Sequence, residues 1–86
     1  MAMDVTEPMK VSTVSSVYLV SPTKFGSIAG HRVKKIKDLT GKENKRFPVG
    51  WEREGVGLYL ELGERMGLGD FLTSEVLNIE YVEPHH

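Results

Sequence analysis

Aliphatic and other residues alternate strictly after Gly55, in the stretch GVGLYLEL. The aliphatic positions are Val56, Leu58, Leu60 and Leu62. A period of two places alternate side chains on the same face of a β-strand. The pattern therefore predicts a strand over 55–62 whose aliphatic face covers the hydrophobic core.

A hairpin, a corner and a final strand are predicted to follow. Residues 63–69 contain three glycines, which indicates a turn, and 70–73 is predicted as a short return strand. Ser and Thr hydroxyls stabilise local turns, so 73–75 is predicted as a one-turn helical corner. Alternation over 76–82 predicts a last strand. We expect that strand to present an open edge that another chain could extend.

The segment Lys10 to Val20 is rich in Val, Ser, Thr and Tyr, which favours a strand over a helix. Both of its alternating faces carry apolar residues. Either part of this strand is covered on both faces, or a bulge near Ser15 and Ser16 changes which face points inward. Residues 21–30 contain one proline and two glycines and are predicted as a loop, of a length suited to binding.

Residues 31–40 fit two structures. As a helix, Val33, Ile36 and Thr40 align at spacings of three and four; as a strand, one face mixes aliphatic residues with lysines. We favour the strand. Polar residues predict a turn over 41–46 and a solvated connection over 52–54. The expected fold is mainly β, a small five-stranded barrel or strongly bent antiparallel sheet with strands over 10–20, 31–39, 55–62, 70–73 and 76–82.

The chain has 86 residues, 40% of them hydrophobic, which suffices for one domain with a small core. We expect a flexible leader over 1–8, a single domain over 9–83 and a tail over 84–86. Domains of this size bury only about 60% of their unfolded surface, so self-association or a protein partner is expected. There is no cysteine, no secretory signal core and no apolar run of about 18 residues. We therefore expect a cytoplasmic protein without disulfides or a membrane span.

Charge is unevenly distributed along the chain, although the net charge is only −1. Residues 24–46 hold eight basic residues against two acidic ones, whereas residues 47–86 hold two basic residues against eight acidic ones. This polarity has two interpretations. A basic face binds phosphates, or the basic segment lies beside the acidic one, in the same barrel or in a neighbouring subunit.

The basic segment is a candidate nucleic-acid surface, because clustered cations bind phosphates and interleaved aromatic rings stack on bases. The candidate cations are Lys24, Arg32, Lys34, Lys35, Lys37, Lys42, Lys45 and Arg46, and the candidate rings are Phe25, Phe47 and Trp51. The simpler interpretation is a solvated strand and turn, with the tryptophan packed in the core or at its rim. The pI near 6.3 also lies below the value of about 9 that is typical of dedicated nucleic-acid domains.

No catalytic, cofactor or metal site is predicted. Gly41-Lys42 lacks the upstream glycine of a phosphate-binding loop, and no dinucleotide fingerprint is complete. The acidic residues fall on positions predicted to be solvated, not in a desolvated pair. Of the three histidines, His85 and His86 lack the partners that fix metal ligands, and His31, beside Arg32, is expected to extend the basic surface. We therefore expect a protein that is not an enzyme.

Two spacings resemble small SH3-like barrel proteins of bacteria and their phages, most of which carry no assigned function. They are Gly-x-x-Leu-x-Leu from Gly55 to Leu60 and Phe-x-Thr-Ser-x-Val-x-x-Ile from Phe71 to Ile79. The bend over 47–51 is similar too, so the resemblance covers roughly half of the chain. It implies an SH3-like barrel and no activity, and no functional residue is carried over. The extra residues 65–68 make the hairpin turn longer than in the family pattern.

Together these features predict a small binding module that acts through protein contacts or self-association, with no cofactor and no metal. The alternative is a nucleic-acid-binding barrel that uses residues 24–46 and the flanking rings.

Overall fold

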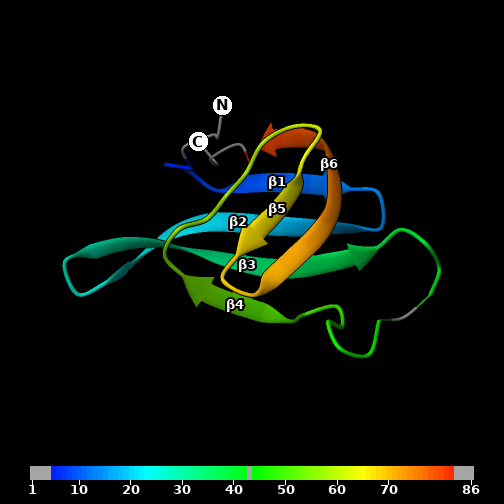
Figure 1. Cartoon of the computed structure of the whole chain (residues 1–86), viewed down its shortest axis with the longest axis horizontal. Coiled ribbons are helices and arrows are strands. Elements are labelled where there is room, and N and C mark those ends of the chain that lie inside the picture. The colour runs from blue at the N-terminus through cyan, green and yellow to red at the C-terminus, as the bar shows by residue number, and fades with distance from the viewer. Residues whose placement is uncertain (1–4, 43, 83–86) are drawn as a thin grey trace.

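The structure is a computed structural model that describes residues 5–42 and 44–82. Its six antiparallel strands are β1 (Met9–Thr13), β2 (Ser16–Phe25), β3 (Ile28–Asp38), β4 (Glu52–Gly55), β5 (Arg65–Leu68) and β6 (Phe71–Tyr81). They form one sheet in the order β4-β3-β2-β1-β6-β5, which curls into a nearly closed barrel (Figure 1). The predicted mainly β barrel is confirmed and is compatible with an SH3-like barrel. It has six strands instead of five, and the described residues contain no helix.

The predicted first strand over 10–20 is two strands joined by a turn at Val14 and Ser15. Thr13 closes this turn, because its buried hydroxyl donates to the carbonyl of Ser16 (3.0 Å) and accepts from the Ser16 N–H (3.1 Å). The chain reverses here, so the inward positions change from Val11 in β1 to Tyr18 and Val20 in β2. Val17 is buried as well, beside an irregularity in the β2–β3 pairing between Val17 and Tyr18, close to the position of the expected bulge.

The predicted loop over 21–30 is wrong, because β2 and β3 continue through it as one long hairpin. Its turn is only Gly26 and Ser27, and Gly26 has a φ of 64° that an L-residue rarely adopts. Pro22 is tolerated because β2 has left β1 by then; the last β2 partner of β1 is Val20. The strand interpretation of 31–40 is confirmed over β3 as far as Asp38.

The predicted strand over 55–62 is also wrong. The extended segment is β4, which was expected to be a solvated connection, and it ends at Gly55. Gly57 and Gly63 both have positive φ, which interrupts an extended run. Between them the chain makes only an isolated bridge, from Tyr59 to Gly67. Of the four alternating aliphatic residues, only Leu60 is fully buried.

Residues 63–69, predicted as a turn, contain β5, and the turn itself is Gly69 and Asp70. The predicted helical corner at 73–75 is instead a bend inside β6. There the inward positions change from Phe71 and Thr73 to Val76, and the pairing with β1 is irregular. The Ser74 hydroxyl fixes the bend through bonds to two hydroxyls of the β1–β2 hairpin, Thr13 (3.0 Å) and Ser15 (2.9 Å).

The core lies between the β1–β4 part of the sheet and the β5–β6 pair folded over it (Figure 1). Phe71 is at its centre, with its ring edge-on to Tyr18 at 5.7 Å. Val5 is buried in this core, whereas residues 1–4 of the predicted leader and the predicted tail over 84–86 lie outside the described residues. No helix long and apolar enough to cross a membrane occurs in the part of the chain that the structure describes.

Candidate binding surfaces

The outer face of β3 carries its cations directly opposite acidic residues of β4. Arg32 is paired in register with Glu54, and its guanidinium donates to that carboxylate at 2.9 and 3.3 Å. Lys34 is likewise opposite Glu52. Opposite charges directly across an antiparallel pair stabilise it modestly. Part of the opposed charge along the sequence is therefore matched inside one barrel.

Lys35 does not extend the basic surface, because it follows Val33 on the inward face of β3 and its side chain is only 2% exposed. Its ammonium donates to the carbonyl of Phe47 at 2.8 Å and forms an ion pair with Asp38. A buried charge requires such partners, since removing it from water is costly. The inward position was hidden in the sequence because lysines occupy both parities of this strand.

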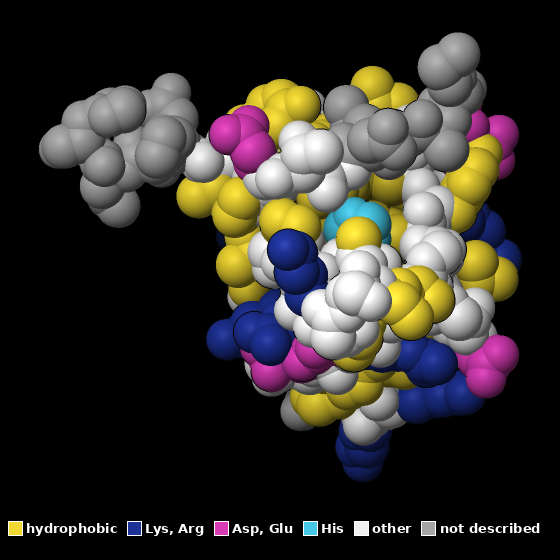
Figure 2. Space-filling view, turned by 90° about the vertical axis from the view of Figure 1, so that its left-hand side faces the viewer, with side chains coloured by type: hydrophobic (Ala, Val, Ile, Leu, Met, Phe, Trp, Pro, Cys, Tyr) yellow, Lys and Arg dark blue, Asp and Glu magenta, His cyan; other side chains and the backbone are white. Residues whose placement is uncertain are grey.

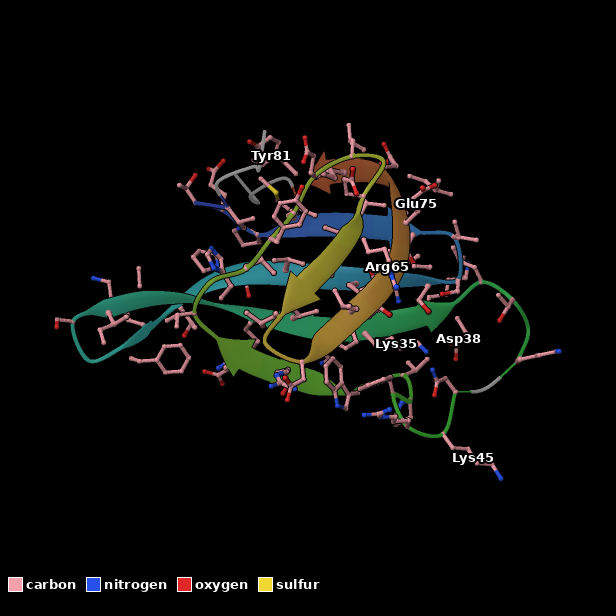
Figure 3. The ribbon with its side chains drawn as sticks, in the orientation of Figure 1. Lys35, Asp38, Lys45, Arg65, Glu75 and Tyr81 are labelled. Carbon is pink, nitrogen blue, oxygen red and sulfur yellow. The ribbon has the colours of Figure 1, made fainter. Side chains whose placement is uncertain are left out.

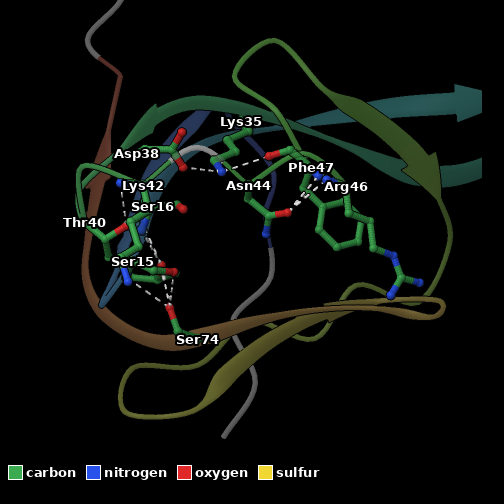
Figure 4. A network of polar contacts seen from close by, with 11 residues as sticks. Ser15, Ser16, Lys35, Asp38, Thr40, Lys42, Asn44, Arg46, Phe47 and Ser74 are labelled. Atoms are coloured by element: carbon green, nitrogen blue, oxygen red, sulfur yellow. Dashed lines mark hydrogen bonds and ion pairs between the residues drawn. The ribbon is translucent and has the colours of Figure 1, made fainter.

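A polar hollow of about 230 Å³ lies beside Lys35 at the end of the barrel where β3 ends (Figure 4). The β1–β2 turn, the end of β3 and the loop over 39–47 line it. Asn44 shapes that loop, because its side-chain carbonyl accepts from the N–H groups of Arg46 (3.0 Å) and Phe47 (3.3 Å). The lining residues are Ser15, Ser16, Lys35, Asp38, Thr40, Lys42 and Asn44.

The remaining predicted cations divide between the two ends of the molecule. Lys24 lies on the β2–β3 hairpin, whereas the others lie at the opposite end, where Figure 3 labels Lys45. The guanidinium of Arg46 is 5.3 Å from the centre of the Phe47 ring. Among the described residues these cations have no acidic partner: Lys24, Lys37, Lys42, Lys45 and Arg46.

The predicted rings are not one stacking surface either. Phe47 and Trp51 are partly buried and pack together at 5.0 Å, and both contact Phe71 at 5.1 and 4.5 Å. This matches the simpler interpretation of Trp51 as a ring at the rim of the core. Phe25 lies apart from them at the tip of the β2–β3 hairpin.

An apolar hollow of about 340 Å³ lies on the outer face between the hairpin tip and the end of β4. Three exposed apolar side chains line it: Phe25 (40% exposed), Ile28 (59%) and Val56 (53%). The Phe25 ring lies across Gly30, where a Cβ would meet a ring carbon at 2.3 Å. Sequence reasoning missed Val56, which was placed on the aliphatic face of the predicted strand over 55–62, and Ile28, which was placed in the predicted loop over 21–30. For Ile28 the signal was the Gly26-Ser27 dipeptide, which indicates a hairpin turn.

A third hollow, of about 440 Å³, lies where the inward face of the hairpin leaves the barrel. Figure 2 looks onto this end and shows a histidine among apolar side chains. His31 Nε2 is 3.1 Å from the carbonyl oxygen of Val5, and its buried Nδ1 has no hydrogen-bond partner among the described residues. His31 therefore packs against the segment before β1 and does not extend the basic surface. The other two histidines, His85 and His86, lie outside the described residues.

Few side chains in the described part of the chain are arranged for metal binding or acid–base chemistry. No three His, Asp or Glu side chains gather there as a metal site would need. One phenol is perturbed: Tyr59 donates a hydrogen bond to Glu61, and this bond raises the pKa of Tyr59. Both side chains lie in the irregular segment before β5 and not in a hollow.

Comparison with known proteins adds no relative: no protein-family model, curated protein or solved structure matches the chain.

Proposed function

We propose that the chain is a small non-enzymatic binding module whose hairpin end, defined by Phe25, Ile28 and Val56, binds an apolar segment of another protein. The single observation that carries the proposal is the exposure of these three side chains around one hollow. They lie on the outer face, so the core does not account for them. Exposed apolar side chains gathered around a hollow and rimmed by polar groups are typical of protein-interaction sites.

The aromatic ring of this surface packs on the backbone of its own barrel. The Phe25 ring lies across Gly30, where a Cβ would meet a ring carbon at 2.3 Å, so this contact restricts the ring although Phe25 is 40% exposed. Fixed aromatic side chains lose little conformational entropy on binding and are frequent hot spots. The rim carries Glu54, which Arg32 neutralises.

A peptide-display selection tests this proposal. Random peptides are selected on the whole protein and counter-selected on the double variant Ile28→Ser/Val56→Ser. We expect enriched peptides with aromatic and aliphatic residues, and amide shifts in NMR that cluster at the hairpin end. The matched control is Leu62→Ser/Leu72→Ser, which removes similarly exposed apolar groups elsewhere and should leave peptide binding intact. Binding that survives the first variant, or that both variants abolish, contradicts the proposal.

Nucleic-acid binding is the second candidate, and one observation favours it. Lys42, Lys45 and Arg46 share one loop without acidic partners in the described residues. Against it, Arg32, Lys34 and Lys35 face acidic residues, and two predicted rings are packed on the core. A fluorescent oligonucleotide that binds in a salt-sensitive way, and is lost on Lys42→Glu/Lys45→Glu, would replace the first proposal.

Two further proposals rest on sequence features alone. The chain belongs among small SH3-like barrel proteins of bacteria and phages, and it works in the cytoplasm.

A further inference from the structure

The second half of β6 has one side without a backbone partner. Along 76–81 the strand pairs with β1, and along 71–75 it pairs with β5. On the β5 side the last bonds are those of Val76, with Gly63 and Glu64 at 2.9 Å each. The expected open edge of the last strand therefore exists, but only beyond Val76.

The register shows which backbone groups face that open side. The Val82 N–H donates to the Pro8 carbonyl, so this pair is hydrogen-bonded toward β1. Hydrogen-bonded pairs alternate along an antiparallel ladder, so Glu80 also bonds toward β1. The N–H and C=O groups of Ile79 and Tyr81 consequently point outward, and nothing in the described residues pairs with them.

This edge lacks the protection that the other edges of the sheet carry. β4 is four residues long and bears three charges, and β5 is bonded on its outer side to Tyr59. The open segment of β6 is Leu77-Asn78-Ile79-Glu80-Tyr81, with one charge and no proline. Its two end residues, Leu77 and Tyr81, are 60% and 56% exposed, and Figure 3 shows Tyr81 at the end of the strand. Edges of this composition add a strand from another chain.

We propose that this edge pairs with the same edge of a second copy, antiparallel about a two-fold axis at Ile79. The segment is complementary to itself in this register. Ile79 faces its own copy, Tyr81 faces Leu77, and Glu80 faces Asn78, which can donate to the carboxylate. A two-fold register centred on Glu80 would instead set two like charges opposite each other. Asn78 already donates to Glu80 within one chain at 2.8 Å, so the two side chains share one outer face.

The proposal is independent of the hairpin end, which lies at another part of the barrel (Figure 1). A pairing of about five residues buries less than a standard interface, so the dimer is weak and concentration-dependent. It joins two six-stranded sheets edge to edge into one continuous sheet.

Sedimentation equilibrium of the whole protein, from about 10 μM to about 1 mM, tests the pairing. We expect the average mass to rise toward twice that of the monomer. Asn78→Glu places a carboxylate opposite Glu80 at two symmetric positions and should weaken the dimer about tenfold, whereas Asn78→Lys should strengthen it several-fold. As controls, Thr40→Glu and Thr40→Lys make the same charge changes in the loop at the far end of the barrel. Neither should alter the average mass relative to that of the unmodified protein.

A second measurement follows the edge amides directly. In hydrogen exchange by NMR, the amides of Ile79 and Tyr81 should gain protection as concentration rises, while that of Glu80 is protected throughout. Tyr81→Pro removes one outward N–H and should abolish the dimer without disturbing the pairing with β1.

Three results would overturn the proposal: a monomer at every concentration, a dimer that Asn78→Glu leaves unchanged, or a dimer that Ile28→Ser/Val56→Ser abolishes. The last result would assign self-association to the hairpin end instead. Failure of the peptide selection, by contrast, would not affect the β6 dimer.

Discussion

The ammonium group of Lys35 donates to the carbonyl oxygen of Phe47 at 2.8 Å, which ties the inward face of β3 to the loop that follows it. The same ammonium forms an ion pair with Asp38, three residues along the strand. One buried cation thus satisfies two acceptors and holds Phe47 where its ring can pack on Phe71.

Replacing Lys35 by Met should destabilise the barrel by about 3 kcal/mol, because the Phe47 carbonyl and the Asp38 carboxylate lose their partner. Urea unfolding followed by Trp51 fluorescence measures the free energy of unfolding. Lys37→Met removes an exposed lysine from the same strand and should change it by less than about 0.5 kcal/mol. Equal effects of the two changes would mean that Lys35 is not buried as described.

Adding one methyl group at Gly30 should cost about 1–3 kcal/mol, because overpacking forces the Phe25 ring and the nearby backbone apart. The new Cβ of Gly30→Ala would lie 2.3 Å from a Phe25 ring carbon and 2.8 Å from the Gly55 carbonyl oxygen. Phe25→Ala relieves only the first contact, so the double variant should recover part of the loss. Thermal unfolding of the four proteins gives the coupling, and strict additivity would contradict contact between ring and glycine.

Thr13→Val should destabilise the protein by about 1–3 kcal/mol, because the buried Thr13 hydroxyl bonds both to Ser16 and to Ser74 of β6. Valine keeps the shape and removes only the hydroxyl. Ser12→Ala, one position away, is the control, since Ser12 makes no side-chain hydrogen bond within the described residues. Urea unfolding should give clearly different free energies of unfolding for the two variants. If Thr13→Val were as stable as Ser12→Ala, the Thr13 hydroxyl would not be what fixes the bend.

The Arg32–Glu54 pair should contribute little to stability and should be sensitive to salt. Both side chains are largely solvated, so a double-mutant cycle with Arg32→Ala and Glu54→Ala should give about 0.2–1 kcal/mol at low salt. The coupling should fall when the ionic strength is raised to about 1 M, where screening acts over only about 3 Å. A coupling above about 2 kcal/mol, or one independent of salt, would contradict a surface pair.

Sequence reasoning was most accurate where a local pattern determines the structure. It failed where contacts between residues far apart in the sequence determine the structure. Alternation and β-branched residues predicted a mainly β barrel and the strand at β3. The run after Gly55 alternates as regularly as a strand, but the positive φ angles of Gly57 and Gly63 interrupt the extended backbone. Of its alternating aliphatic residues, only Leu60 is fully buried. Thr73 and Ser74 did mark a change of direction, yet their hydroxyls bond to the neighbouring strands β5 and β1 and so bend a strand where a helix was expected.

The candidate surfaces were harder to predict than the fold. Charge counting found the basic segment but not its partners, because the acidic residues of β4 come opposite Arg32 and Lys34 only through the β3–β4 register. Likewise the hairpin end joins Phe25 and Ile28 to Val56, which is nearly thirty residues away along the chain. A single sequence carries no direct signal for such pairings.

The pairing of Met9 with Tyr81 also bears on how the chain folds. The three strands β1 to β3 follow one another through two tight turns, so their contacts are local and form early. β6 must then close a loop that spans most of the chain before Phe71 and Val76 can complete the core. We therefore expect barrel closure to be the slow step, and a chain still lacking β6 on the ribosome to expose the apolar face of its first three strands.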